Sequence, residues 1–452
     1  MTTHLFLGPT LPAERALAAL PDAVLHPPVR HLDVLRLDLE PGDTVAVVDG
    51  LFFQTAAVRH KELLWLLDHG IAVVGSSSMG ALRAAELAPY GMRGIGQVFA
   101  GFASGRYDSD DEVAVAHGDE DLGWRQFSDP LVNIRAAAHR AHQAGVLTEL
   151  QQHAIVCEAR QTFFPRRRLT RIVESCRAQG TLDGPAAERM LAWAAREPWD
   201  AKAEDAVQLL EALARRGWLV RQRDGDDLPI EGYPPLMSQW LAKTRPIRVG
   251  GQTTTDWYVE SLLRLFAQDT VASVYREGIR TLAAGGGDDR AQGAEAEAAA
   301  EALCLTRGIT ADDGPAAESL GRYLDGDERA TLPPQRQRLL MAARVAVGSL
   351  PAPPAPEPRF RDHPAAAVAV DVMRFNAELA RKGAKYRPSH IAEATIDRYF
   401  TEAWKADDDL ETQVRRRGFR DIHHFRSCAR HFLAFAIAHG VPDVSWDQEA
   451  TA

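Results

Sequence analysis

Alternation of apolar and polar segments along the first 125 or so residues predicts a small α/β domain. Short apolar, β-branched runs at 4–7, 44–48 and 71–75 are typical of buried strands, and 112–116 is a fourth candidate. Helical spacing separates them at 12–20, 57–69 and 79–87. Because strands and helices alternate, we expect an α/β fold with a mostly parallel sheet flanked by helices.

The pattern changes after Pro130 to long segments rich in Ala, Leu, Arg and Glu, so the rest of the chain is expected to be largely α-helical. Helices are predicted at 131–144, 148–162, 166–179, 185–196, 200–217 and 257–278, with a short strand or turn at 246–255. Linkers are predicted at 285–289 and at the proline-dense 351–358. The expected domains are an α/β core at 1–125, its helical part at 126–220, a helical extension with a Gly/Ala/Glu-rich linker at 221–350, and a C-terminal helical segment at 359–452.

Small and polar residues follow each predicted strand. Gly8 and Thr10 follow the first, Asp49 and Gly50 the second, and His117 the last. In open parallel sheets, ligands bind beyond the carboxyl ends of the strands. We therefore expect these residues to face one crevice together with the residues that follow the third strand.

The run GSSSMG at 75–80 joins the third strand to a helix through small residues only. Ser76, Ser78 and Gly80 give the small-x-Ser-x-small outline of a nucleophile elbow, which makes Ser78 the candidate nucleophile. The backbone N–H groups of Met79 and Gly80 are candidate donors to an oxyanion, with Ser76 and Ser77 beside them. The competing interpretation is that these serines only cap the helix.

A serine nucleophile needs a base, and two histidines are candidates. His117 follows a predicted strand, and Asp111 or Glu112 would supply its carboxylate; a solvated acidic turn is the alternative. His60 lies in the helix after Asp49 and shares a face with leucines, which is more typical of a core histidine.

Two cations near the crevice are candidates for binding an anionic group. Lys61 would reach the crevice from the same helix as His60, although exposure to solvent is its default. Arg83 lies one turn after Ser78, but its three-residue spacing from Glu86 also allows an ion pair. Gly91, Gly94 and Gly96 are interpreted as a turn, and the segment 163–168 (FFPRRR) as a surface hinge or an anchor for an acidic partner.

Composition excludes several functions. A net charge of −10 argues against a dedicated nucleic-acid binder, and no apolar run reaches the roughly 18 residues that a membrane span needs. The four cysteines are scattered and the N-terminus lacks a signal sequence, which favours the cytoplasm. No phosphate-binding GxxxxGK[ST] loop or convincing metal-ligand cluster is found, so we expect neither a cofactor nor a metal.

Several stretches within roughly the first 215 residues resemble the TfuA-like family, whose members are encoded beside YcaO enzymes. These stretches are LGPTL (7–11), VVDGLFFQ (47–54), the segment 59–96, YDSDDEVAVAH (107–117), DPLVNIRA (129–136), FFPRRR (163–168) and WDAKAEDAVQLL (199–210). The residues beyond them show no such resemblance and are expected to be an added partner-binding region.

The resemblance implies a role in peptide backbone thioamidation. A YcaO enzyme uses ATP to activate a backbone amide, and TfuA-like proteins are thought to help supply the sulfur. The implied partners are the YcaO enzyme, a thiocarboxylated ThiS-like sulfur-carrier protein and, as a further candidate, the precursor peptide. The expected activity is hydrolysis of the carrier thiocarboxylate. A non-catalytic adaptor that docks on YcaO is the alternative, and a general esterase is less favoured.

Overall fold

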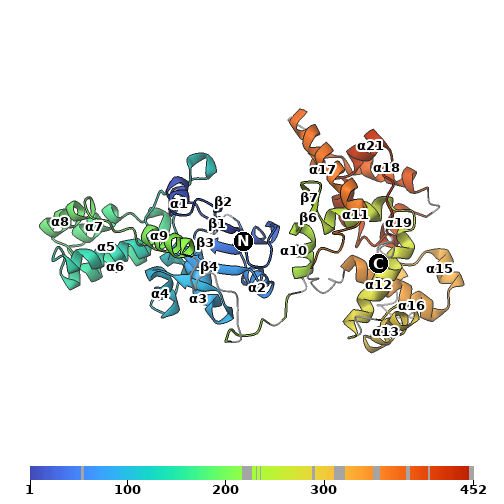
Figure 1. Ribbon diagram of the computed structural model, residues 1–452, viewed down its shortest axis with the longest axis horizontal. Helices are drawn as coiled ribbons and strands as arrows, with labels where there is room; N and C mark the ends of the chain where they lie inside the picture. Colours follow the sequence, from blue (N-terminus) through green and yellow to red (C-terminus); the bar gives the residue numbers. More distant parts are fainter. Residues whose placement is uncertain are drawn as a thin grey trace. The chain divides into compact units, whose positions relative to one another are not determined.

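The computed structural model describes residues 1–51, 55–215, 226–230, 232–234, 236–287, 291–309, 321–349, 357–382, 387–405 and 408–446. These residues form two compact units, Met1–Gly232 and Tyr233–Ala452 (Figure 1). Each unit is described separately below. The linker predicted at 351–358 lies mostly outside the described residues, as does the second half of the one predicted at 285–289.

A five-stranded parallel sheet is the centre of the first unit. Its strands, in the order β2-β1-β3-β4-β5, are β1 (Thr3–Phe6), β2 (Val24–His26), β3 (Thr44–Val47), β4 (Ala72–Ser76) and β5 (Arg93–Ile95). All four pairings are parallel. The predicted α/β class with a parallel N-terminal sheet is therefore confirmed, as is the largely helical remainder of the chain.

Helices cover the sheet and bury its apolar side chains. On one face, α1 (Ala13–Ala19) and α9 (Ala201–Ala214) share a core with alternate residues of β1 and β3. The helices α2 (His60–Asp68) and α3 (Met79–Leu87) follow β3 and β4 as crossover connections, which are right-handed in nearly all proteins. A short α4 (Gln97–Ala103) contacts α3 and α9.

Four further helices pack around a core of their own within the first unit. They are α5 (Leu131–Gln143), α6 (Glu149–Gln161), α7 (Leu169–Ala178) and α8 (Gly184–Ala194). Figure 1 shows them grouped together at one end of the unit, with α9 between them and the sheet. Each agrees with a helix predicted from the sequence to within a few residues.

Two local predictions in the first unit are wrong. Residues 112–116 form no strand: a 3-10 turn, η3 (Asp110–Glu112), leads into irregular backbone, and only His117 forms an isolated bridge with Gln126. The supposed turn at Gly91–Gly96 instead contains β5, the edge strand. Gly94 lies within this strand, and a glycine is needed there because a Cβ would be 2.2 Å from the Phe99 ring.

The second unit is mainly helical. It begins with α10 (Leu236–Thr244) and the antiparallel hairpin of β6 (Pro246–Val249) and β7 (Gln252–Thr255), as predicted for 246–255. The helix expected at 257–278 is two helices, α11 (Asp256–Phe266) and α12 (Thr270–Gly285). The other α-helices among the described residues of this unit are α13 (Gly293–Thr306), α15 (Gly326–Thr331), α16 (Pro334–Ser349), α17 (Ala365–Lys382), α18 (Glu393–Trp404), α19 (Leu410–Arg416), α20 (Ile422–Ala429) and α21 (Leu433–His439).

Separate apolar clusters stabilise this unit. The largest is aromatic and joins α11, α17, α18 and α20, while α12, α13 and α16 share a second one. Within the described part of the chain, no helix is both long and apolar enough to span a membrane.

Candidate active site at the carboxyl ends of β1, β3 and β4

The strand order reverses between β1 and β3, which makes this point the topological switch of the sheet. Asp49, just after β3, ties the loops there together. One carboxylate oxygen accepts hydrogen bonds of 3.0 Å from the N–H groups of Gly8 and Thr10, and the other accepts one of 2.6 Å from the Thr10 hydroxyl. The side chain of Asp49 therefore organises the β1–α1 turn.

The β4–α3 turn is too tight for side chains at its two glycines. A Cβ on Gly75 would lie 2.1 Å from the Gly80 carbonyl oxygen, and one on Gly80 would lie 1.7 Å from the carbonyl oxygen of Val47. Between them, Ser77 has a φ of 67°, in the left-handed region that non-glycine residues seldom occupy. The small residues at 75–80 are thus explained by close packing of α3 against the sheet.

The three serines of this turn have different roles. Ser76 donates its hydroxyl to the carbonyl oxygens of Ile95 and Asp205, and Ser77 donates to the carbonyl oxygen of Lys202 at 2.7 Å. Both are fully buried, so they brace the turn. Ser78 stands at the N-cap of α3 but makes no side-chain capping bond. The capping interpretation is therefore wrong for Ser78, the candidate nucleophile.

Neither of the two predicted oxyanion donors is among the described residues that line the cavity beside this turn, and they differ in their hydrogen bonds. The N–H of Gly80 donates to the carbonyl oxygen of Val48 at 3.2 Å. The N–H of Met79 makes no hydrogen bond to any residue the structure describes. The prediction that the Met79 and Gly80 amides both bind an oxyanion is therefore wrong for Gly80, because its N–H is already bonded.

A cavity of about 290 Å³ opens beside this turn. It brings together Asp49, Gly50, Ser78 and His117, which the sequence predicted to face one crevice. The other lining residues are apolar or offer only backbone: Pro9, Leu51, Val113, Ala114, Val115, Ala116, Phe164 and Pro165. The result is a small cavity with apolar walls and three polar side chains.

His117 is held in one orientation by its loop. Its Nδ1 lies 2.6 Å from the carbonyl oxygen of Gly118, and because a carbonyl only accepts, Nδ1 carries the proton. The neutral ring then presents Nε2 as a proton acceptor. Gln126, paired with His117 across the loop, donates to the carbonyl oxygen of Pro9 at 2.6 Å, which fixes the loop beside the β1–α1 turn.

The carboxylates predicted to orient His117 are engaged elsewhere. Asp111 forms an ion pair with the buried guanidinium of Arg167 at 2.6 Å. Glu112 forms a bidentate ion pair with Arg135, with distances of 2.7 and 2.9 Å. Neither is among the described residues that line the cavity. A carbonyl, rather than a carboxylate, therefore orients the imidazole. Because Arg167 is buried, it is also no surface anchor for an acidic partner.

The other predicted residues form a cluster on α2 and α3 that does not line the described cavity. His60 Nε2 lies 2.8 Å from a carboxylate oxygen of Glu86, and Arg83 donates to the same oxygen at 2.6 Å. The side chain of His60 is 47% exposed, so the core interpretation is wrong. Lys61 donates to the carbonyl oxygen of Gly232 at 2.6 Å. The ion-pair interpretation of Arg83 is confirmed.

Lys202, in the first turn of α9, was missed from the sequence. Its side chain is fully buried, and its ammonium donates at 3.2 Å to the carbonyl oxygen of Val113, a wall residue of the cavity. Burial lowers the pKa of Lys202, while the charges of Asp49 and Asp200 oppose that shift. A lysine within the apolar stripe of WDAKAEDAVQLL was the available signal, because lysine is seldom buried without a role.

Part of the first unit matches a known protein family. Residues 49–168 match the family described as TfuA-like protein, a span that includes Asp49, Ser78 and His117. No curated protein matches the chain. The first unit of this chain therefore contains a TfuA-like domain, as its sequence resemblance predicted.

Proposed function

We propose that this protein hydrolyses the C-terminal thiocarboxylate of a small ThiS-like carrier protein and delivers the sulfide to a YcaO enzyme for backbone thioamidation. The observation that carries the proposal is the convergence of Ser78, His117 and Asp49 on one cavity at the switch point of the sheet. TfuA-like proteins are associated with YcaO-dependent thioamidation, which gives that cavity a substrate class.

The chemistry is acyl transfer at the thiocarboxylate carbon. The Ser78 oxygen bonds to that carbon while His117 Nε2 accepts the hydroxyl proton. The imidazolium then gives this proton to the sulfur as the C–S bond breaks, so that hydrosulfide leaves and the imidazole is neutral again. Water, deprotonated by the same imidazole, attacks the resulting ester. The carrier leaves with a carboxylate, and Ser78 regains its proton. The net reaction converts thiocarboxylate and water into carboxylate and hydrogen sulfide, which ionises.

Two groups at the site would stabilise negative charge in this reaction: the charge that develops on the oxyanion and the charge of the thiocarboxylate itself. Met79 is the first residue of α3, where the helix dipole favours negative charge, and in the proposed reaction its N–H would donate to the developing oxyanion beside Ser78. A thiocarboxylate is itself an anion and resists attack by a nucleophile. The amine of Lys202, behind the wall at Val113, supplies positive charge that offsets this resistance whenever it is protonated.

The shape of the cavity favours a thin polypeptide end. It has a volume of about 290 Å³ and is lined by Pro9, Phe164 and Pro165, which suits a chain end without side chains, such as Gly-Gly. Asp49 accepts three hydrogen bonds from Gly8 and Thr10 and therefore holds the β1–α1 turn in place beside the cavity. We assign Asp49 a positioning role.

A reconstituted thioamidation reaction tests the proposal. With thiocarboxylated carrier as the sulfur source, the YcaO enzyme should need this protein, and the Ser78→Ala variant should fail. With free sulfide supplied instead, the same variant should no longer limit the reaction. If Ser78→Ala still supports the carrier-dependent reaction at the wild-type rate, the proposed catalysis is wrong.

A non-catalytic adaptor is the second candidate. The observation that favours it is the incomplete constellation: His117 is oriented by a carbonyl and only one amide is available for an oxyanion. An adaptor would remain necessary in the presence of free sulfide, whereas a hydrolase would not. The two sulfur sources therefore separate the two functions in one experiment.

A further inference from the structure

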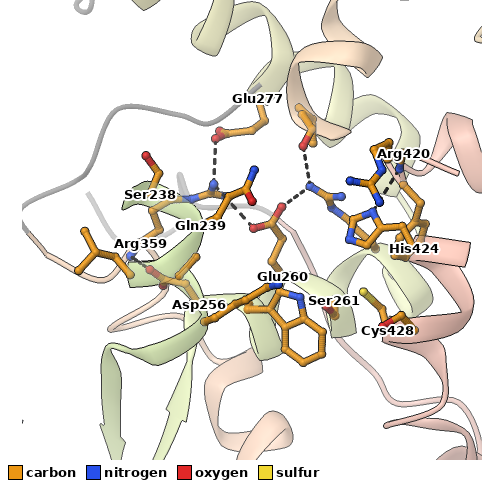
Figure 2. A pocket seen from close by; sticks show the side chains of 18 of the residues that line it. Ser238, Gln239, Asp256, Glu260, Ser261, Glu277, Arg359, Arg420, His424 and Cys428 are labelled. Carbon is orange, nitrogen blue, oxygen red and sulfur yellow. Dashed lines mark hydrogen bonds and ion pairs between the residues drawn. The ribbon is translucent and has the colours of Figure 1, made fainter. Parts of the chain in front are cut away.

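The second unit contains a larger cavity, of about 420 Å³, to which the TfuA-like region contributes no residue. It lies among α10, α11, α12 and α20, with Arg359 entering from the segment before α17 (Figure 2). Its volume is within the range of small-molecule sites, roughly 300–1,000 Å³. The proposed sulfide release leaves this cavity without a role.

The cavity is positively charged although the chain as a whole carries −10. Five basic side chains line it against three acidic ones. The basic residues are Lys243, Arg245, Arg264, Arg359 and Arg420, and the acidic residues are Asp256, Glu260 and Glu277. The lining therefore has a surplus of two positive charges when its histidines are neutral.

The acidic side chains are already held by partners of their own. Glu260 pairs with Arg264 and lies 3.8 Å from Arg359, which in turn is 3.5 Å from Glu277 (Figure 2). Asp256 accepts hydrogen bonds of 3.0 Å from the backbone N–H groups of Arg359 and Phe360. The buried floor is thus a fixed, internally compensated network. Lys243 and Arg420 stand at the exposed rim, where Arg420 also pairs at 3.0 Å with Asp421, a residue outside the lining, so the rim keeps its net positive charge through Lys243.

His424 is a partly buried, neutral hydrogen-bond donor among the lining residues. Its Nδ1 accepts a hydrogen bond of 3.2 Å from the backbone N–H of Arg420, so the neutral ring carries its proton on Nε2 and can donate it. Burial, followed by the nearby guanidinium groups of Arg264 and Arg420, lowers the pKa of His424 to about 4. The Glu260 and Asp421 carboxylates oppose this shift and do not overcome it.

We propose that this cavity binds a small organic anion, with its carboxylate or phosphate at the rim near Arg420 and Lys243 and a flat apolar body against Trp257 and Phe419. Guanidinium and ammonium groups bind such oxyanions through charge-assisted hydrogen bonds. Aromatic walls suit a planar body. Binding is non-covalent, because burial raises the pKa of the Cys428 thiol to about 11 and keeps it protonated.

Isothermal titration calorimetry of the full chain tests the proposal, with AMP, benzoate and inorganic phosphate as probes and adenosine as the uncharged control. Both AMP and benzoate should bind, and the tighter of the two identifies the preferred oxyanion. AMP should bind about tenfold or more tightly than adenosine, because the charged group adds hydrogen bonds to cations. Inorganic phosphate should bind more weakly than AMP because it lacks the flat body.

The variant that removes both rim charges, Lys243→Gln with Arg420→Gln, should weaken the binding by about fivefold or more and flatten its salt dependence. Arg398→Gln, an exposed arginine of α18 away from the cavity, is the matched control and should bind as the wild type does. Failure of AMP and benzoate to bind at millimolar concentration would overturn the proposal. So would unchanged affinity in the rim variant, or equal affinity for inorganic phosphate and AMP.

Discussion

At the scale of single residues, two neighbouring buried serines in one turn differ in their hydrogen bonds and in whether they line the cavity. Ser77 is fully buried and bonded to a carbonyl, whereas Ser78 lines the cavity and makes no capping bond. The pair therefore provides an internal control for distinguishing catalysis from structure.

Ser78→Ala should lower the rate of sulfide release by about 100-fold or more with little change in stability, because it removes the nucleophile and no described hydrogen bond. Ser77→Ala should instead lower the free energy of unfolding by about 1–3 kcal/mol, because the buried carbonyl of Lys202 loses its donor. Steady-state kinetics and urea unfolding of both variants provide the measurements. Full activity in Ser78→Ala, together with loss of activity in His117→Ala, would identify water as the nucleophile.

Lys202 leads to a prediction about pH. Because burial lowers its folded-state pKa, the native protein binds fewer protons than the unfolded chain between that pKa and the ordinary lysine value of about 10.4. Its contribution to the free energy of unfolding therefore increases as the pH rises through this window and is lost as the pH falls.

Lys202→Met should consequently be more stable than the wild type near neutral pH, and its advantage should shrink as the pH rises. Urea unfolding of both proteins at several pH values measures this difference. Sulfide release by Lys202→Met should also be slower, because the positive charge beside the cavity is gone. A stability difference that is the same at every pH would contradict a perturbed buried amine.

At the scale of elements, the β4–α3 turn was predictable and the approach to His117 was not. The small residues between an apolar run and a helix-forming segment indicate a tight turn, and α3 begins and ends at the predicted residues. Residues 112–116 have the apolar content of a strand, but tertiary contacts hold them in another conformation. Glu112 forms an ion pair with Arg135, and Val113 packs against α3, α4 and α5. These long-range contacts leave no signal in the local pattern.

The same distinction applies to the site residues. Ser78, Asp49 and Gly50 were found because residues that follow parallel strands share one edge of the sheet. His117 lines the same cavity, although the strand from which its place was predicted does not form. The pairs of Asp111 with Arg167 and of His60 with Glu86 depend on tertiary packing, so spacing alone placed these residues wrongly. Lys202 comes from a helix more than 80 residues after His117 and was missed for the same reason.

Gly80→Ala should test the packing of this turn. The new methyl group would meet the Val47 carbonyl oxygen at 1.7 Å, so α3 must shift, and we expect a loss of about 2–3 kcal/mol in the free energy of unfolding. Gly184→Ala is the matched control, because its Cβ would meet nothing within 4 Å and its φ is not in the left-handed range. Thermal denaturation of both variants provides the comparison. Equal stability would contradict the close approach of α3 to β3.

At the scale of the whole molecule, the chain consists of two units with separate apolar cores. All residues assigned to sulfide release lie in Met1–Gly232. Because each unit buries its own core, the first should fold without the second.

A protein consisting of residues 1–232 should therefore unfold cooperatively and release sulfide from the carrier at a rate within about threefold of the full chain. Circular dichroism and the sulfide assay measure both properties. A truncated protein that folds but releases no sulfide would show that the second unit is required for catalysis, contrary to the assignment of the site.

The most direct test of the central claim omits the YcaO enzyme altogether. The purified full chain is mixed with thiocarboxylated carrier, and released sulfide is quantified while the intact mass of the carrier is followed. We predict multiple turnovers, with each sulfide matched by one carrier whose terminal sulfur has been replaced by oxygen, and near-background release with Ser78→Ala. No sulfide above the buffer control from the wild-type protein would contradict the account.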